Sequence, residues 1–189
     1  SIEGADELSA ARVIIAPSTH MRQIPAMQAR VGTVAPGTPA IVGTPCGDGK
    51  FGPPELPVGT LAQLADYVIV EADGAKRLPL KAHAAHEPVI PPEANQTILV
   101  VGASGFGKPM QERVHRAALA AERLGVSPET VVTPELWAKF LNAEALHTRV
   151  LVNQAETEQA QADARALAAG LRTPVCMAAL QKGWIECLC

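Results

Sequence analysis

Short runs of β-branched and aliphatic residues recur along the chain, and this recurrence constrains the fold most strongly. Most of the runs are apolar at every position, which is typical of strands buried on both faces of a parallel sheet. They occupy residues 12–16, 40–43, 67–71, 97–101, 131–133, 149–152 and 174–177. We therefore expect one mainly parallel sheet that contains 67–71, 97–101 and 149–152.

Helical spacing of apolar residues fills the stretches between the later strands. The clearest helix is predicted over 109–124, with Gly125 as its C-cap. Thr133 is typical of an N-cap and predicts a second helix after it. A third is predicted from about 156 to 169, ending at Gly170. The alternation predicts a three-layer α/β fold, in which helices flank a mainly parallel sheet.

Length and composition favour one α/β domain over residues 1–189. The chain is 48% hydrophobic, which suffices for one substantial core. Residues 43–59 interrupt the alternation with five glycines and four prolines. We expect this Gly/Pro-rich segment to be a surface loop with few core contacts.

Charge and composition also exclude some functions. A net charge of −3 and 3% aromatic residues argue against nucleic-acid binding, so local cations must hold any small anionic ligand. No apolar run approaches the ~20 residues that a bilayer requires, and the first residues do not resemble a signal peptide. We expect a cytoplasmic protein without a membrane segment, whose four cysteines are reduced thiols.

A charged cluster follows the apolar run at 67–71. Its members are Glu71, Asp73, Lys76, Arg77 and Lys81. At the carboxyl end of a parallel strand, Asp73 is placed to bind Mg²⁺. Glu71 is suited to be a second ligand of the metal or a base that orients water. The three cations suit a phosphate or another oxyanion. The alternative is that the charges pair with one another, or remain solvated on the surface.

The cluster lies in a run that continues to His86-Glu87-Pro88-Val89-Ile90-Pro91 and resembles the signature of the YqeC-like proteins. Further pieces of the resemblance are Thr19-His20-Met21, Gly107-Lys108-Pro109, Val114-His115-Arg116 and Val152-Asn153-Gln154. Members of this family are described as accessory proteins for selenium-dependent molybdenum hydroxylases. The resemblance implies a P-loop NTPase-like fold, Mg²⁺ with ATP or GTP, or a molybdopterin-type or selenium-containing ligand, and a molybdenum hydroxylase as partner.

The chain departs from the family at its start. Family members usually begin with a strand and a glycine-rich GGGGKTT-type loop, whereas nothing comparable precedes Arg12 here. Two alternatives follow: relative to the family the sequence is N-terminally incomplete, or the protein works without this loop.

Residue by residue, the local pattern and the resemblance together imply the following roles. Asp73 and Glu71 are catalytic, with Asp73 also on the metal. The ligand or its phosphates are bound by Thr19, His20, Lys76, Arg77, Lys81, His86 and Lys108. Asn153 is expected to bind a base, although capping of a strand end by its amide is an equal alternative. We expect Asp73, Lys76, Arg77 and His86 to converge on one crevice, with Thr19 and His20 at its rim, and we interpret His83 as incidental.

Two glycine patterns do not predict phosphate loops. Residues 47–52 satisfy GxGxxG, but Pro53 and Pro54 follow where a dinucleotide fold requires a helix. Residues 102–108 satisfy GxxxxGK, but Pro109 supplies neither the hydroxyl nor the backbone N–H of a Walker loop.

Three functions remain open. The first is an accessory protein in maturation of a molybdenum hydroxylase, with nucleotide hydrolysis or cofactor handling near Asp73. The second is a binding module that holds a phosphorylated small molecule, a cofactor or a partner protein without hydrolysis. The third is an inactive remnant of an NTPase.

Overall fold

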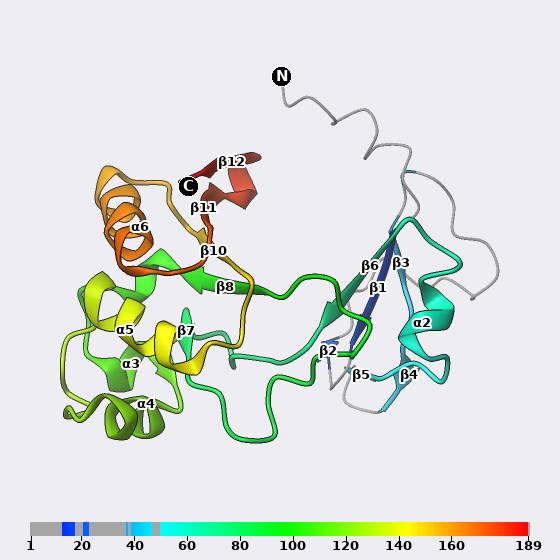
Figure 1. The fold of residues 1–189 in the computed structure, drawn as a ribbon, viewed down its shortest axis with the longest axis horizontal. Coiled ribbons are helices and arrows are strands. Elements are labelled where there is room, and N and C mark those ends of the chain that lie inside the picture. Colours follow the sequence, from blue (N-terminus) through cyan, green and yellow to red (C-terminus); the bar gives the residue numbers. More distant parts are fainter. Residues whose placement is uncertain (1–12, 18–20, 23–36, 38, 47–49, 189) are drawn as a thin grey trace. The chain divides into compact units, whose positions relative to one another are not determined.

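The computed structural model of the chain describes residues 13–17, 21–22, 37, 39–46 and 50–188 (Figure 1). The chain divides into two compact units. The first comprises residues 1–74 and 87–94, and the second comprises residues 75–86 and 95–189. Each unit has its own sheets and its own hydrophobic core.

The main sheet of the first unit is parallel, with the strand order β3-β1-β6. Its strands are β1 (Val13–Pro17), β3 (Ala40–Ile41) and β6 (Tyr67–Glu71). The pairing of β1 with β6 runs from Val13 opposite Tyr67 to Pro17 opposite Glu71. Glu71 therefore lies at the carboxyl edge of this sheet, as the sequence predicts.

The described part of the first unit also contains a small antiparallel sheet, in the order β2-β5-β4. It consists of β2 (Met21–Arg22), β4 (Thr44–Pro45) and β5 (Lys50–Gly52), and helix α2 (Val58–Leu61) follows. The prediction of a loop over 43–59 is thus wrong in part. Pro45 is compatible with a strand because β4 is an edge strand, and Phe51 is buried.

The main sheet of the second unit has the order β12-β11-β10-β8. Strands β8 (Ile98–Gly102), β10 (Arg149–Asn153) and β11 (Val175–Ala179) are parallel, and β12 (Trp184–Cys187) is antiparallel to β11. On one face Val101, Val152 and Met177 lie side by side and are buried. On the other face Ile98 and Val100 are 56% and 57% exposed, so burial of both faces is not confirmed for β8.

The helix predicted over 109–124 is interrupted. Helix α3 (Met110–Arg113) leads into β9 (Val114–His115), and α4 (Ala117–Leu124) begins only after Arg116, which has a left-handed φ of 61°. Strand β9 pairs in parallel with β7 (Leu80–Lys81). The prediction of one continuous helix is wrong because this tertiary pairing overrides the local helical spacing. Gly125 does end α4, with a φ of 68°.

Helix α5 (Pro134–Glu144) begins as the sequence predicts, since Thr133 accepts a hydrogen bond from the backbone N–H of Leu136. Its Trp137 and Phe140 are buried and stacked, with ring centroids 4.6 Å apart. Helix α6 (Glu158–Gly170) packs against α5. Helix α6 ends at Gly170, as predicted, and Leu171 is its C-cap. A Cβ at Gly170 would come within 2.7 Å of the Cβ of Ala138, so the glycine permits close packing of the two helices.

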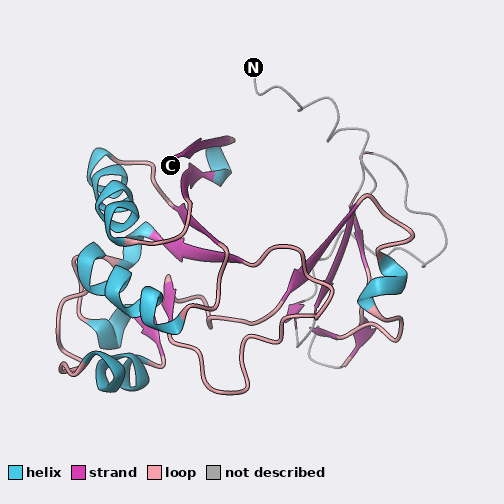
Figure 2. Ribbon diagram, in the orientation of Figure 1, coloured by secondary structure: helices cyan, strands magenta, loops and turns pink. Residues whose placement is uncertain are grey.

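The α/β class, with mainly parallel sheets flanked by helices, is confirmed (Figure 2). The expectation of a single sheet is wrong, because 67–71 pairs within the first unit whereas 97–101 and 149–152 pair within the second. Residues 131–133 form only an isolated bridge, between Val131 and Pro109. None of the described helices is long and apolar enough to cross a membrane.

Candidate functional site

A pocket of about 590 Å³ lies in the second unit, beside the carboxyl ends of its parallel strands. Its lining comes from η1 (Ala103–Gly105) after β8, from the segment joining β10 to α6, from α6 itself, and from η2 (Leu180–Lys182) after β11. We call it the edge pocket. Its polar lining residues are Ser104, Asn153, Gln154, Glu156, Thr157, Gln159, Asp163 and Gln181.

Position and size make the edge pocket the candidate site. Open parallel sheets bind ligands beside the carboxyl ends of their strands, and pockets for small molecules measure about 300–1,000 Å³. The lining contains four side-chain amides and two carboxylates but no lysine or arginine. This lining suits a neutral group that has both hydrogen-bond donors and acceptors, such as a nucleobase or a sugar. It suits a phosphate less well.

Asn153 is the last residue of β10 and lines the edge pocket. Its Oδ1 accepts a hydrogen bond from the backbone N–H of Leu180 at 3.1 Å. Capping of a strand end, one of the two alternatives from the sequence, is thereby confirmed. Base binding stays a prediction, and the two roles are compatible because the amide nitrogen carries two further donors.

Gln154 contributes a second amide that sequence reasoning missed. It has a left-handed φ of 67°, a conformation that costs a non-glycine residue about 1–2 kcal/mol. The hydroxyl of Ser104 donates to its Oε1 at 2.6 Å. The contact joins the residue that follows β10 to η1, at the carboxyl edge of the sheet. Because it joins residues 50 positions apart, no local signal in the sequence reveals it.

Gly102, the last residue of β8, brings Pro79 of the charged run to the same edge. A Cβ here would lie 2.7 Å from both Oε1 of Gln154 and Cβ of Pro79, so only glycine fits. The backbone N–H of Gly102 also donates to the carbonyl oxygen of Pro79 at 2.9 Å. The part of the charged run in the second unit, residues 75–86, is therefore anchored beside the edge pocket through Pro79.

The predicted cations of the second unit occupy different environments. Lys76 and Arg77 are exposed in a turn, where both have left-handed φ values, of 50° and 64°. Strain of this kind is often retained at ligand-binding turns. Lys81 is buried in β7, whereas His86 and Lys108 are exposed outside strands and helices. The turn at Lys76 and Arg77 precedes the anchored Pro79, and the buried Lys81 follows it by two residues.

Three backbone N–H groups of the loop over 102–108 are engaged in hydrogen bonds. Those of Gly102, Phe106 and Gly107 donate to the carbonyl oxygens of Pro79, Ala103 and Val132. A Walker loop needs such groups free to surround phosphates. Helix α3, after Lys108, has four residues. These observations support the interpretation that this GxxxxGK pattern is a strand-to-helix turn.

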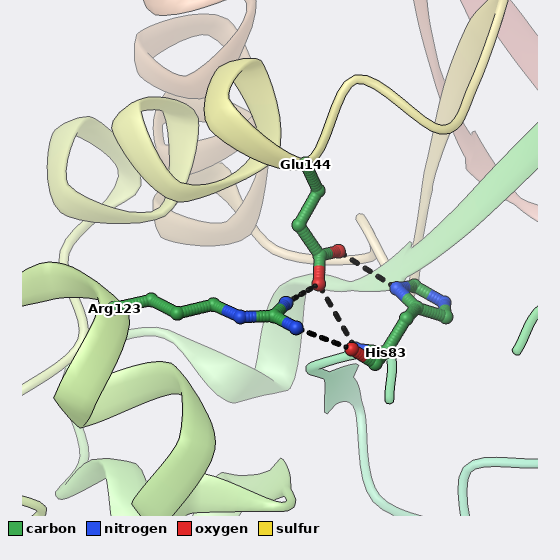
Figure 3. Close-up of polar contacts among 3 residues, drawn as sticks. All are labelled: His83, Arg123 and Glu144. Carbon is green, nitrogen blue, oxygen red and sulfur yellow. Dashed lines mark hydrogen bonds and ion pairs between the residues drawn. The ribbon is translucent and has the colours of Figure 1, made fainter. Parts of the chain in front are cut away.

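A polar network around the buried carboxylate of Glu144 holds the segment after Lys81 in place, and it includes a residue that we interpreted as incidental. Nδ1 of His83 lies 2.7 Å from Oε2 of Glu144, and the backbone N–H of His83 donates to Oε1 at 2.9 Å. Arg123 donates to the same Oε1 at 2.6 Å and to the carbonyl oxygen of His83 at 2.9 Å (Figure 3). The side chains of His83 and Glu144 are 5% and 4% exposed. His83 therefore fixes the run to α4 and α5.

His147 lies in the electrostatic field of this network. Burial lowers the pKa of its imidazole below the ordinary value of 6.5, while Glu144 opposes that shift and His83 adds to it. Protonation of His147 is thus coupled to the charge on the network.

The acidic pair belongs to the first unit. Glu71 ends β6, and Asp73 follows it by two residues. Burial raises the pKa of the Glu71 carboxyl above its ordinary value of 4.5, and the charge of Asp73 raises it further. Two carboxyl groups that repel each other in this way suit a cation or a shared proton.

Some expectations remain untested. Thr19 and His20 lie outside the described residues. Asp73 belongs to the first unit and Lys76, Arg77 and His86 to the second, so their predicted convergence stays a prediction. Among the residues that the structure describes, no three His, Cys, Asp or Glu side chains are grouped to hold a metal ion.

Comparisons with known proteins place this geometry in context. The family model described as "YqeC protein" matches residues 5–118. An uncharacterized protein of Escherichia coli (strain K12), YqeC, is 29% identical over 141 residues, which cover 67% of this chain and 55% of that protein. The chain thus spans about half the length of this curated relative. No solved structure matches the chain.

Proposed function

The chain belongs to the YqeC family, and from this premise we propose that it is a nucleotide-binding accessory protein in the maturation of a selenium-dependent molybdenum hydroxylase. In this proposal the edge pocket takes the base and ribose of ATP or GTP. The hydroxylase is the partner protein, and the nucleotide-bound form assists its maturation.

The observation that carries the proposal is the amide-rich edge pocket beside three parallel strand ends. Amides offer a donor and an acceptor on one side chain, and purine edges present the complementary pairs. The carboxylates of Glu156 and Asp163 repel phosphate. They therefore favour the base over the phosphates as occupant of this pocket.

The remaining residues fit the other parts of such a ligand. Lys76 supplies a point charge and Arg77 a planar fork, both exposed in the strained turn before Pro79, and together they suit the phosphates. The prediction that Glu71 and Asp73 hold Mg²⁺ concerns the first unit alone, where the charge of Asp73 raises the pKa of Glu71 and carboxylate oxygens are the ligands that Mg²⁺ prefers.

Titration calorimetry with Mg-ATP and Mg-GTP tests the proposal, and Asn153→Asp is the informative variant. The aspartate keeps an oxygen that can accept from Leu180, so the cap at the strand end is retained. It replaces the two amide donors by negative charge. We expect wild type to bind one of the nucleotides and Asn153→Asp to bind it at least about tenfold more weakly, as loss of one or two hydrogen bonds predicts.

Gln111→Glu is the matched control. It makes the same amide-to-carboxylate exchange on the exposed surface of α3, outside the edge pocket. The control should bind like wild type. Equal binding by wild type and Asn153→Asp would contradict the assignment of the pocket, and absence of binding by wild type would contradict nucleotide binding itself.

The accessory role is tested separately, in cells that lack the gene and carry a selenium-dependent molybdenum hydroxylase. We expect low hydroxylase activity, restored by the wild-type gene and by Gln111→Glu but not by Asn153→Asp. Full hydroxylase activity without the gene would contradict the role.

A second candidate function is a module that binds a phosphorylated small molecule without hydrolysis. It is favoured by the three engaged backbone N–H groups of Gly102, Phe106 and Gly107, because these donors are not free to surround phosphates as those of a Walker loop are. Binding of nucleotide without release of inorganic phosphate over many hours would favour this candidate. Steady Mg²⁺-dependent phosphate release would favour the hydrolysing one.

A further inference from the structure

Two cysteines face each other across the C-terminal hairpin of the second unit. Cys176 on β11 is paired in register with Cys187 on β12, eleven positions along the chain. Both are thiols, and their Sγ atoms lie 2.8 Å apart. Cys187 is exposed, and Cys176 is half-buried.

The backbone geometry of this pair suits a disulfide. The N–H of Leu188 donates to the carbonyl oxygen of Val175 at 2.8 Å, which makes Val175 and Leu188 a hydrogen-bonded pair. Since such pairs alternate along an antiparallel ladder, Cys176 and Cys187 form the next, non-hydrogen-bonded pair. Their Cα atoms are expected about 4.5 Å apart, within the range of about 4.4–6.8 Å that disulfides span.

From this geometry we propose that Cys176 and Cys187 form a redox modification site, at which a hydroperoxide converts the two thiols reversibly into a disulfide between β11 and β12. The proposal is independent of the proposed nucleotide function. Exposure makes Cys187 the thiol that the oxidant reaches first.

The reaction is balanced with the hydroperoxide as the oxidant. The Cys187 thiolate attacks the terminal peroxide oxygen, the O–O bond breaks, and the alcohol leaves with the proton that Cys187 released. The Cys176 thiolate then attacks the resulting sulfenic sulfur, the S–O bond breaks, and water leaves with the second proton. The two thiols lose two electrons, and the peroxide gains them.

The bond would close a ring that contains η2. This turn carries Gln181, which lines the edge pocket, and Leu180, whose backbone N–H donates to Asn153. Oxidation therefore restrains the hairpin that forms one wall of that pocket.

The test treats the reduced protein with hydrogen peroxide, counts thiols and maps disulfides after tryptic digestion. Trypsin cuts after Lys182 and separates the two cysteines into peptides 173–182 and 183–189. We expect loss of two of the four thiols, a linked pair of these peptides with two hydrogens less, and full return of the thiols with dithiothreitol. Amide hydrogen exchange over 184–188 should slow on oxidation.

Variants identify the partners, because Cys189 also lies in peptide 183–189 and is outside the described residues. The linked peptides should persist in Cys189→Ser and in the control Cys46→Ser, and disappear in Cys187→Ser. Retention of all four thiols in wild type, oxidation to sulfinic acid without a link, or a link that needs Cys189 in place of Cys187 would overturn the proposal.

Discussion

His83 and Glu144 are joined twice, through the Nδ1 atom and through the backbone N–H of the histidine, at 2.7 and 2.9 Å. The two residues are 61 positions apart. The pair holds the segment after Lys81, which belongs to the charged run, against the end of α5. Arg123 adds a third hydrogen bond to the same carboxylate.

Glu144→Gln should destabilise the second unit by about 1–3 kcal/mol, because the buried carboxylate accepts three hydrogen bonds and the amide cannot accept all of them. Both tryptophans, Trp137 and Trp184, lie in this unit, so urea unfolding followed by tryptophan fluorescence reports on it. The control Glu122→Gln, on an exposed position of α4, should change stability by less than about 0.5 kcal/mol. Equal stability of the two variants would show that the network contributes little.

Glu71 should titrate above its ordinary pKa of 4.5, and Asp73→Asn should bring its pKa part of the way down. Only part of the shift disappears because burial is the larger cause. A raised pKa means that the folded state holds the proton more tightly, so its stabilising contribution is complete below the unfolded value and is lost as pH rises through the folded pKa. Carboxyl chemical shifts followed by NMR check this, and an unchanged pKa in Asp73→Asn would contradict the coupling.

Gly170→Ala should lower the free energy of unfolding by about 1–3 kcal/mol, because the new Cβ would overlap that of Ala138 and disturb the packing of α5 on α6. We expect this loss although alanine favours helices. The double variant with Ala138→Gly removes the overlap. We expect it to recover part of the loss, which a double-mutant cycle measured by urea unfolding quantifies. Additive losses would mean that the two Cβ atoms do not meet.

Local chemistry explains which parts of the fold were predictable. Thr133 and Gly125 act through their nearest neighbours, so the start of α5 and the end of α4 were read correctly. The break at Val114 depends on its pairing with Leu80, which no short-range pattern encodes.

The same limit applies to the site. Asn153 was found because it follows an apolar strand, and Lys76 and Arg77 because their charges cluster. Ser104 and Gln154 were missed because only the fold brings them together. Glu144 carries no signal in the sequence beyond being a glutamate at the end of a predicted helix.

Pro109→Ser should not create strong Mg-ATP binding, even though it completes the sequence pattern of a Walker loop. The backbone N–H of Gly107 already donates to Val132, and that of Gly102 to Pro79, so a new hydroxyl cannot supply the missing ring of donors. Calorimetry on wild type and variant checks this. A large gain in affinity would overturn the assignment of this loop as a structural turn.

The edge pocket as a nucleotide site is the central claim, and the side-chain amide resonances of the protein test it most directly. In ¹⁵N-correlated NMR spectra, titration with Mg-ATP or Mg-GTP should shift the side-chain NH₂ signals of Asn153, Gln154, Gln159 and Gln181, which line the pocket. Those of Asn142 and Gln111, outside it, should remain in place. Saturable shifts confined to the pocket are the predicted result. Shifts confined to Asn142 or Gln111, or no shifts at millimolar nucleotide, would contradict the account.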